Sequence, residues 1–161
     1  MNSVVVIIML ALAFGLIMLT FRSKKKHKEN LRELNEFAHE NDALITQSEY
    51  WFGVKAKTKI GLDEHTSKLF FIRYVHDSIS SIVVDLAQVK GVTKKIKSRT
   101  VGEGSQQQTV IETIGLALSF EDPSRKEVFM EFFNTDFDRL SLSGELQTAE
   151  KWEEIIRKMV G

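Results

Sequence analysis

Histidine is the side chain with the widest chemical range in this chain, but its four copies are dispersed. None has a second ligand at the short spacing of a metal site, and the absence of cysteine removes the thiol nucleophile and the thiolate ligand. A Gly-x-Ser-x-Gly elbow is also missing. We therefore expect no catalytic residue, no metal and no cofactor, and we predict that the protein is not an enzyme. The histidines are His27, His39, His65 and His76.

Two loops contain residues typical of ligand binding, but neither completes a motif. Gly102–Gln108 has the composition of a phosphate loop, yet it lacks the later glycine and lysine and joins two predicted strands. Asn134–Asp138 alternates oxygen ligands without the glycine and the final acid of a calcium loop. Glu112 lies on the apolar side of a predicted strand and has no evident acid–base partner.

Residues 3–21 contain no charged side chain, and the sequence RSKKKHK follows them directly. As a helix this run is about 28 Å long, close to the hydrocarbon thickness of a bilayer. A cleaved signal peptide carries its positive charges before a shorter apolar core. The order here is reversed, so we predict an uncleaved transmembrane anchor over residues 1–21, with the lipid bilayer as its partner through residues 3–21.

The cations behind this run predict its orientation, because lysine and arginine at the end of a span stay on the cytoplasmic side. We expect a single-pass protein of the inner (plasma) membrane, with its N-terminus outside and its C-terminal domain in the cytoplasm. The lack of cysteine agrees with a reducing compartment. The residues expected to contact the membrane surface are Arg22, Lys24, Lys25, Lys26 and Lys28.

The net charge of zero conceals an uneven distribution. Five cations lie at residues 22–28, acids predominate over residues 29–42, and the remainder is nearly neutral. Nucleic-acid-binding proteins usually have a basic body, so no nucleic-acid partner is expected. We divide the chain into the anchor (1–21), a basic juxtamembrane segment with an amphipathic helix (22–43), and one folded domain (44–161), which is long enough to bury its own core.

Two periodicities follow the anchor. In Glu29–Asn41 an apolar stripe of Leu31, Leu34, Phe37 and Ala38 predicts a helix, which either docks on its own domain or forms oligomers. From Ile45 onward the period changes to two and predicts seven strands. They are Ile45–Phe52, Thr58–Leu62, Lys68–Val75, Ser81–Asp85, Val89–Arg99, Thr109–Phe120 and Lys126–Asn134.

A helical stripe of Trp152, Ile155, Ile156 and Met159 predicts a C-terminal helix, with Thr148 as its N-cap. Seven antiparallel strands followed by such a helix resemble the pleckstrin-homology-like (PH-like) fold. The stretches IGLDEHTSKLFFI and SIVVDLAQVKGVTKKIKSRT are similar to PH-like domains found behind one membrane span in bacterial proteins of unassigned role. The resemblance implies an α+β fold, a bent antiparallel β-barrel with one open corner plugged by the C-terminal helix.

Two basic clusters lie within this domain. Lys55, Lys57 and Lys59 occupy the place where lipid-binding PH domains carry basic residues, so the resemblance implies contact with an anionic headgroup. A solvated strand face explains the same three lysines. The second cluster, Lys94, Lys95, Lys97 and Arg99, protects an edge strand, faces the bilayer or accepts a partner strand.

The leading interpretation is a membrane-tethered cytoplasmic interaction module that binds a protein or peptide partner, not yet identified. Such a partner would add as a strand to an exposed edge, at Ser81–Asp85 or Lys94–Arg99. The alternatives are an anionic phospholipid-binding domain and an accessory subunit of a membrane complex, held by the span itself.

We expect the full chain to stay with the membrane pellet after an alkaline carbonate wash, because residues 3–21 remain in lipid. A C-terminal fluorescent protein that matures only in the cytoplasm should be bright, and deletion of residues 3–21 should release the fusion into the supernatant. A reporter active only outside the cell, or a full-length chain found in the buffer fraction, contradicts the predicted anchor and orientation.

Overall fold

The computed structural model describes residues 27–102, 107–138 and 141–160. The chain divides into two compact units, Met1–Glu33 and Leu34–Gly161, and the second contains both sheets. The predicted anchor and the cations at positions 22–26 lie outside the described residues. Within those residues, no helix is both long enough and apolar enough to cross a membrane.

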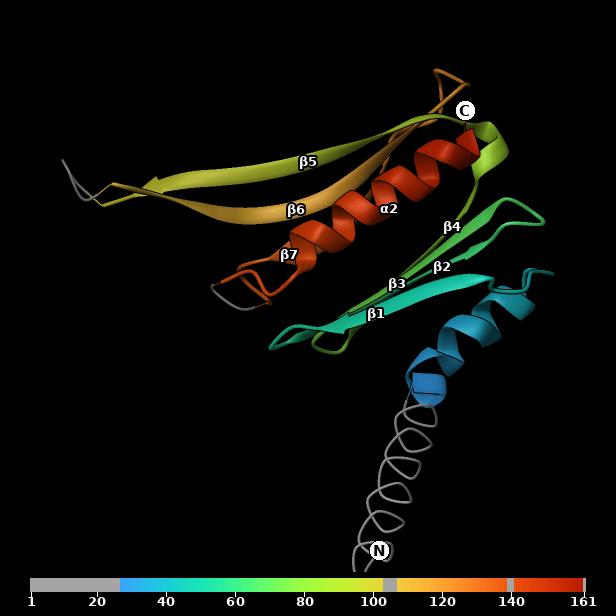
Figure 1. Cartoon of the computed structure of the whole chain (residues 1–161), viewed down its shortest axis with the longest axis horizontal. Coiled ribbons are helices and arrows are strands. Elements are labelled where there is room, and N and C mark those ends of the chain that lie inside the picture. The colour runs from blue at the N-terminus through green and yellow to red at the C-terminus, as the bar shows by residue number, and fades with distance from the viewer. Residues whose placement is uncertain (1–26, 103–106, 139–140, 161) are drawn as a thin grey trace, which may run out of the picture. The chain divides into compact units, whose positions relative to one another are not determined.

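Seven strands form two antiparallel sheets (Figure 1). The first sheet has the order β1 (Gln47–Phe52), β2 (Ala56–Asp63), β3 (Lys68–Val75) and β4 (Ser78–Asp85). A 3-10 turn, η1 (Leu86–Gln88), leads to the second sheet of β5 (Val89–Val101), β6 (Gln108–Phe120) and β7 (Val128–Asn134). The strands predicted from alternation agree with these bounds to within three residues at each end.

The expected closed barrel is wrong. The described strands pair only as β1-β2-β3-β4 and β5-β6-β7, so no backbone ladder joins the two sheets. Single contacts make the junction instead. The indole of Trp51 in β1 donates to the carbonyl of Phe132 in β7 at 2.9 Å, and the N–H of Lys55 donates to the carbonyl of Phe137 at 2.8 Å. At the other junction the chain leaves β4 through η1, whose first turn is capped by the Asp85 carboxylate.

The core lies between the sheets and is completed by α2 (Glu145–Val160), which runs along β5, β6 and β7 (Figure 1). Trp152 and Ile156 of α2 are fully buried, as the predicted stripe requires. The predicted N-cap at Thr148 is wrong, because its N–H already bonds to the carbonyl of Gly144 at 2.9 Å. The other core residues include Ile60, Leu62, Leu69, Phe71, Ile114, Leu116, Leu118, Met130 and Phe132.

The predicted juxtamembrane helix spans residues 27–39. From Leu34 onward it belongs to the second unit, and Leu34 and Ala38 are completely buried. Phe37 meets the ring of Phe70 edge-to-face, with 5.6 Å between ring centroids. A Cβ at Gly61 would lie 2.9 Å from a Leu34 methyl carbon, so β2 has no side chain at this crossing. These contacts favour docking of this part of the helix on its own domain.

Asp63, at the end of β2, ties the β2–β3 turn to the segment that precedes β1. Its carboxylate accepts the N–H of Leu44 at 2.9 Å, the Thr66 hydroxyl at 2.8 Å and the N–H of His65 at 2.9 Å. Burial raises the pKa of this carboxyl, but the donors together outweigh it and lower the pKa to about 2.

We expect Asp63→Asn to reduce stability at neutral pH and to remove part of its acid sensitivity. The folded pKa of about 2 lies below the ordinary value of 3.8, so the carboxylate stabilises the fold above pH 4. This contribution, on the order of 2 kcal/mol, is lost as the pH falls from 4 to 2. Urea unfolding at several pH values measures it.

The control for this experiment is Asp42→Asn, which replaces an exposed carboxylate at a positive φ of 54° that asparagine also adopts. The parent and the control should lose stability in parallel below pH 4, and Asp63→Asn should lose less. Identical curves for all three proteins contradict the assignment.

Candidate functional site

A groove separates the inner face of β3 and β4 from one side of β7. Its volume is about 290 Å³. β3 contributes Phe71, Arg73 and Val75, and β7 contributes Phe129 and Glu131. The remaining lining residues come from β4 and are Ser78, Ile79, Ser80 and Ile82. We refer to this site as the β4–β7 groove.

The register of the first sheet determines which β4 side chains face the groove. Ser78, Ser80 and Ile82 lie opposite Val75, Arg73 and Phe71 of β3, respectively. Residues directly opposite share one face, and successive side chains alternate between faces. The side chains of Ile79, Ser81 and Val83 therefore alternate to the outer face of the sheet, although Ile79, close to the β3–β4 turn, also borders the groove.

Arg73 is the only charged residue that β3 contributes to the groove, and its side chain is 4% exposed. Its guanidinium donates to the Asp138 carboxylate at 2.8 Å and to the Thr58 hydroxyl at 2.7 Å. The Glu131 carboxylate lies 3.2 Å away. Within the described part of the chain, the buried Nε–H of Arg73 has no acceptor. An unpaired buried donor is costly, and this atom is closed off from the groove as well as from solvent.

The charge of this group restricts what the groove can bind. One guanidinium faces two carboxylates, and the Asp138 carboxylate also accepts the N–H of Asn134 at 2.8 Å. The formal balance is negative, so a third acid beside Arg73 would be repelled. A neutral segment avoids that repulsion.

The outer edge of β4 borders the groove and carries no charged residue from Ser78 to Val84. Ile79 is 65% exposed and Val83 is 39% exposed. Edge strands normally carry a lysine, a proline or a β-bulge, or are covered by another segment, and these features prevent pairing with a second chain. Because β4 uses none of these between Ser78 and Val84, its edge is suited to pairing with another strand.

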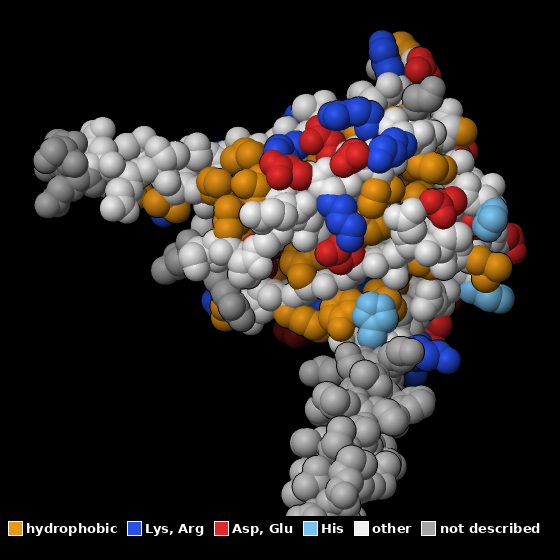
Figure 2. Space-filling view, in the orientation of Figure 1, with side chains coloured by type: hydrophobic (Ala, Val, Ile, Leu, Met, Phe, Trp, Pro, Cys, Tyr) orange, Lys and Arg blue, Asp and Glu red, His pale blue; other side chains and the backbone are white. Residues whose placement is uncertain are grey.

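The second predicted edge, Lys94–Arg99 of β5, is different because acidic residues surround it. Lys94 pairs with Glu150 and Lys95 with Glu127, while Lys97 and Arg99 share Glu112. The N–H of Lys94 donates to Glu153 of α2 at 3.2 Å, so α2 covers part of this edge. Figure 2 shows the same mixing of cations and acids over the face that carries α2.

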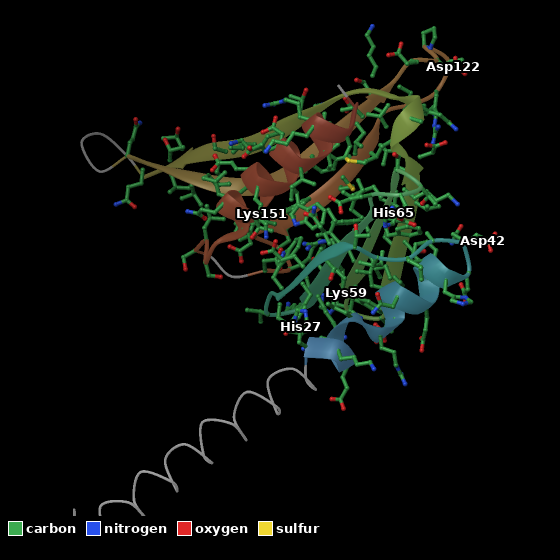
Figure 3. All side chains as sticks on the ribbon, turned by 45° about the vertical axis from the view of Figure 1, so that its right-hand side comes forward. His27, Asp42, Lys59, His65, Asp122 and Lys151 are labelled. Atoms are coloured by element: carbon green, nitrogen blue, oxygen red, sulfur yellow. The ribbon has the colours of Figure 1, made fainter. Side chains whose placement is uncertain are left out.

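The structure does not place Lys55, Lys57 and Lys59 in one exposed row. Lys55 is exposed, but Lys59 has no exposed surface although it lies on the outer face of β2 (Figure 3). Lys57 lies between two rings, 5.9 Å from the Phe52 centroid and 5.4 Å from the Tyr74 centroid. Of the predicted membrane-surface cations, only Lys28 falls within the described residues, and it is exposed.

Among residues 27–102, 107–138 and 141–160, no three histidine or acidic side chains gather as a metal site would require. Part of the glycine-rich loop, residues 103–106, lies outside these ranges. Glu112 takes part in the ion pairs to Lys97 and Arg99.

The sequence analysis missed Arg73, Glu131 and Asp138. A signal existed for the first, because Arg73 is the one cation inside the otherwise apolar run LFFIRYV and shares the phase of Leu69 and Phe71. The partner carboxylates lie about 60 residues away in the chain, and nothing in their spacing indicates the contact. Comparisons with protein-family models, with curated proteins and with solved structures find no match for this chain.

We expect Arg73→Met to lower the free energy of unfolding by about 3–5 kcal/mol, because it leaves two carboxylates without their buried cation. Urea unfolding followed by tryptophan fluorescence measures the loss. Arg157→Met removes an exposed pair with Glu153 and should cost less than about 1 kcal/mol.

Adding Asp138→Asn to Arg73→Met should recover part of the loss, since it removes one of the unpaired charges. A loss for Arg73→Met no larger than that for Arg157→Met contradicts the role assigned to the cluster.

Proposed function

We propose that this protein is a binding module that takes an extended segment of a polypeptide, which adds as a strand along β4 and places side chains in the β4–β7 groove. The observation that carries the proposal is an uncharged, unprotected edge strand beside a largely apolar groove. Strand addition uses main-chain hydrogen bonds for affinity and pockets for alternate side chains for specificity.

The groove defines the chemistry of the segment. Phe71, Ile82 and Phe129 favour an apolar side chain at every second position of the segment. Arg73 is already paired with Glu131 and Asp138, and these two carboxylates disfavour an acid in the segment. The preferred ligand is therefore an extended stretch of alternating apolar and small polar residues.

The predicted anchor adds a location to this proposal. If residues 3–21 span the inner membrane as expected, the domain lies in the cytoplasm and binds its ligand close to the bilayer. The burial of Lys59 and the pairing of Lys94, Lys95 and Lys97 favour polypeptide binding over recognition of anionic headgroups. An accessory role through the span itself stays a prediction from the sequence.

Selection of a random peptide display library on the full-length chain tests the proposal. Enriched peptides should share alternating apolar residues and lack acids over that stretch. A synthetic copy of the best peptide should bind the Ser80→Lys variant about tenfold more weakly or worse, because the lysine projects into the groove from β4.

Ser124→Lys provides the matched control, since Ser124 is an exposed serine in the β6–β7 turn. This variant should retain the parent affinity, and both variants should retain the parent unfolding curve. Peptides without a shared pattern, or equal affinity for the parent and Ser80→Lys, contradict the proposed groove.

A further inference from the structure

The sequence of the β4 edge is complementary to itself. In an antiparallel pair centred on Ser81, that residue meets its own copy and Ile79 meets Val83. On the other face, Ser80 meets Ile82. Both Ile79 and Val83 are exposed in the single chain and face the same side of the sheet, and opposed β-branched residues are favourable cross-strand pairs.

The charges at the ends of β4 fix this register. Centring on Ser81 pairs every uncharged residue from Ser78 to Val84 with another uncharged residue. The next position would bring Asp77 opposite Asp85, where like charges are unfavourable, so pairing stops there. A shift that centres on Ile82 would instead place Asp85 opposite Ile79 within the paired stretch. A one-residue slip would turn the groove face of one copy toward the outer face of the other.

The groove gains a suitable occupant in the Ser81-centred arrangement. Each copy brings Ile82 beside the Ser80 position of its counterpart, on the face that carries Arg73 and Phe71 and borders the groove. The incoming strand is neutral and alternates isoleucine or valine with serine, which is the chemistry that the groove prefers. It adds no acid beside Glu131.

We infer that the segment that pairs with β4 is β4 of a second copy of this chain, which joins the two four-stranded sheets into one of eight strands. The inference rests on the proposed function, since it names the ligand of the same edge. Seven paired residues bury little surface compared with the 1,200–2,000 Å² of stable interfaces, so the contact is weak in dilute solution. Confinement to one membrane, as the predicted anchor implies, raises the effective concentration and favours pairing.

Disulfide trapping tests the inference, because the native chain has no cysteine. At the two-fold axis two copies of residue 81 lie on one face with Cα atoms about 4.5–5.5 Å apart, within the range of a disulfide. We expect the full-length Ser81→Cys chain in its native membranes to form a disulfide-linked dimer on mild oxidation. Ser80→Cys and Ser124→Cys, which do not meet their own copies, should stay largely monomeric.

A charge substitution in β4 provides a second test of the inference. Ile79→Lys in the Ser81→Cys background should abolish the linked dimer, because each lysine would be forced against Val83 of the other copy. Val54→Lys changes a similarly exposed residue in the β1–β2 turn and should leave the dimer unchanged. Unfolding curves confirm that both variants stay folded.

Absence of a linked dimer for Ser81→Cys, equal linking at all three cysteine positions, or linking that survives Ile79→Lys overturns the inference. Binding of the selected peptide shows whether a negative result concerns only the pairing of two copies or also the proposed function. If the peptide binds and Ser81→Cys does not link, β4 accepts a strand but not its own copy. If neither occurs, β4 is not a binding edge. If both occur, the peptide should inhibit linking.

Discussion

The buried guanidinium of Arg73 is the interaction on which the junction between the two sheets depends. It lies on β3, and its carboxylate partners lie on β7 and just beyond it, so one cation joins segments from both sheets. The Asp138 carboxylate approaches β1 so closely that a Cβ at Gly53 would lie 1.9 Å from its oxygen. Glycine at that turn is therefore a requirement of the ion pair. Side-chain charge performs here what a backbone ladder would perform in a closed barrel.

Alternation was sufficient to locate the strands but not to pair them across the molecule. Lys68–Val75 has the predicted bounds because both of its ends are marked by charged or polar turn residues. The closed barrel failed because closure depends on whether two distant edges exchange backbone bonds, and local periodicity contains no information on that. Trp51 illustrates the limit, since its indole takes the place of a ladder bond to Phe132.

The sequence predicted the edge strand of the candidate site but not its buried ion pairs, because those pairs join residues far apart in the chain. Ser81–Asp85 was named, with Lys94–Arg99, as an accepting edge because PH-like barrels bind partners by strand addition, and the structure places it at the outer edge of the first sheet. The resemblance to lipid-binding PH domains singled out Lys55, Lys57 and Lys59, yet Lys59 is buried, and Lys94 of the second basic cluster is paired with Glu150 of α2. Their acidic partners come from distant segments. The sequence shows Arg73 as an unusual cation in an apolar strand, but only the structure identifies the carboxylates that it pairs with.

The edge strands differ in whether they are protected, and this difference limits the number of copies that can associate. Pairing through β4 is isologous: each copy uses the same strand, so neither copy retains a free β4 edge. The opposite edge of that sheet, β1, carries Glu49, which Lys151 and Trp152 of α2 already engage, and β5 is lined with lysines. A β4-to-β5 contact would be heterologous and could propagate into a filament. The ion-paired cations on β5 and the cover that α2 gives this strand would oppose such a contact and keep the β4 association to two copies.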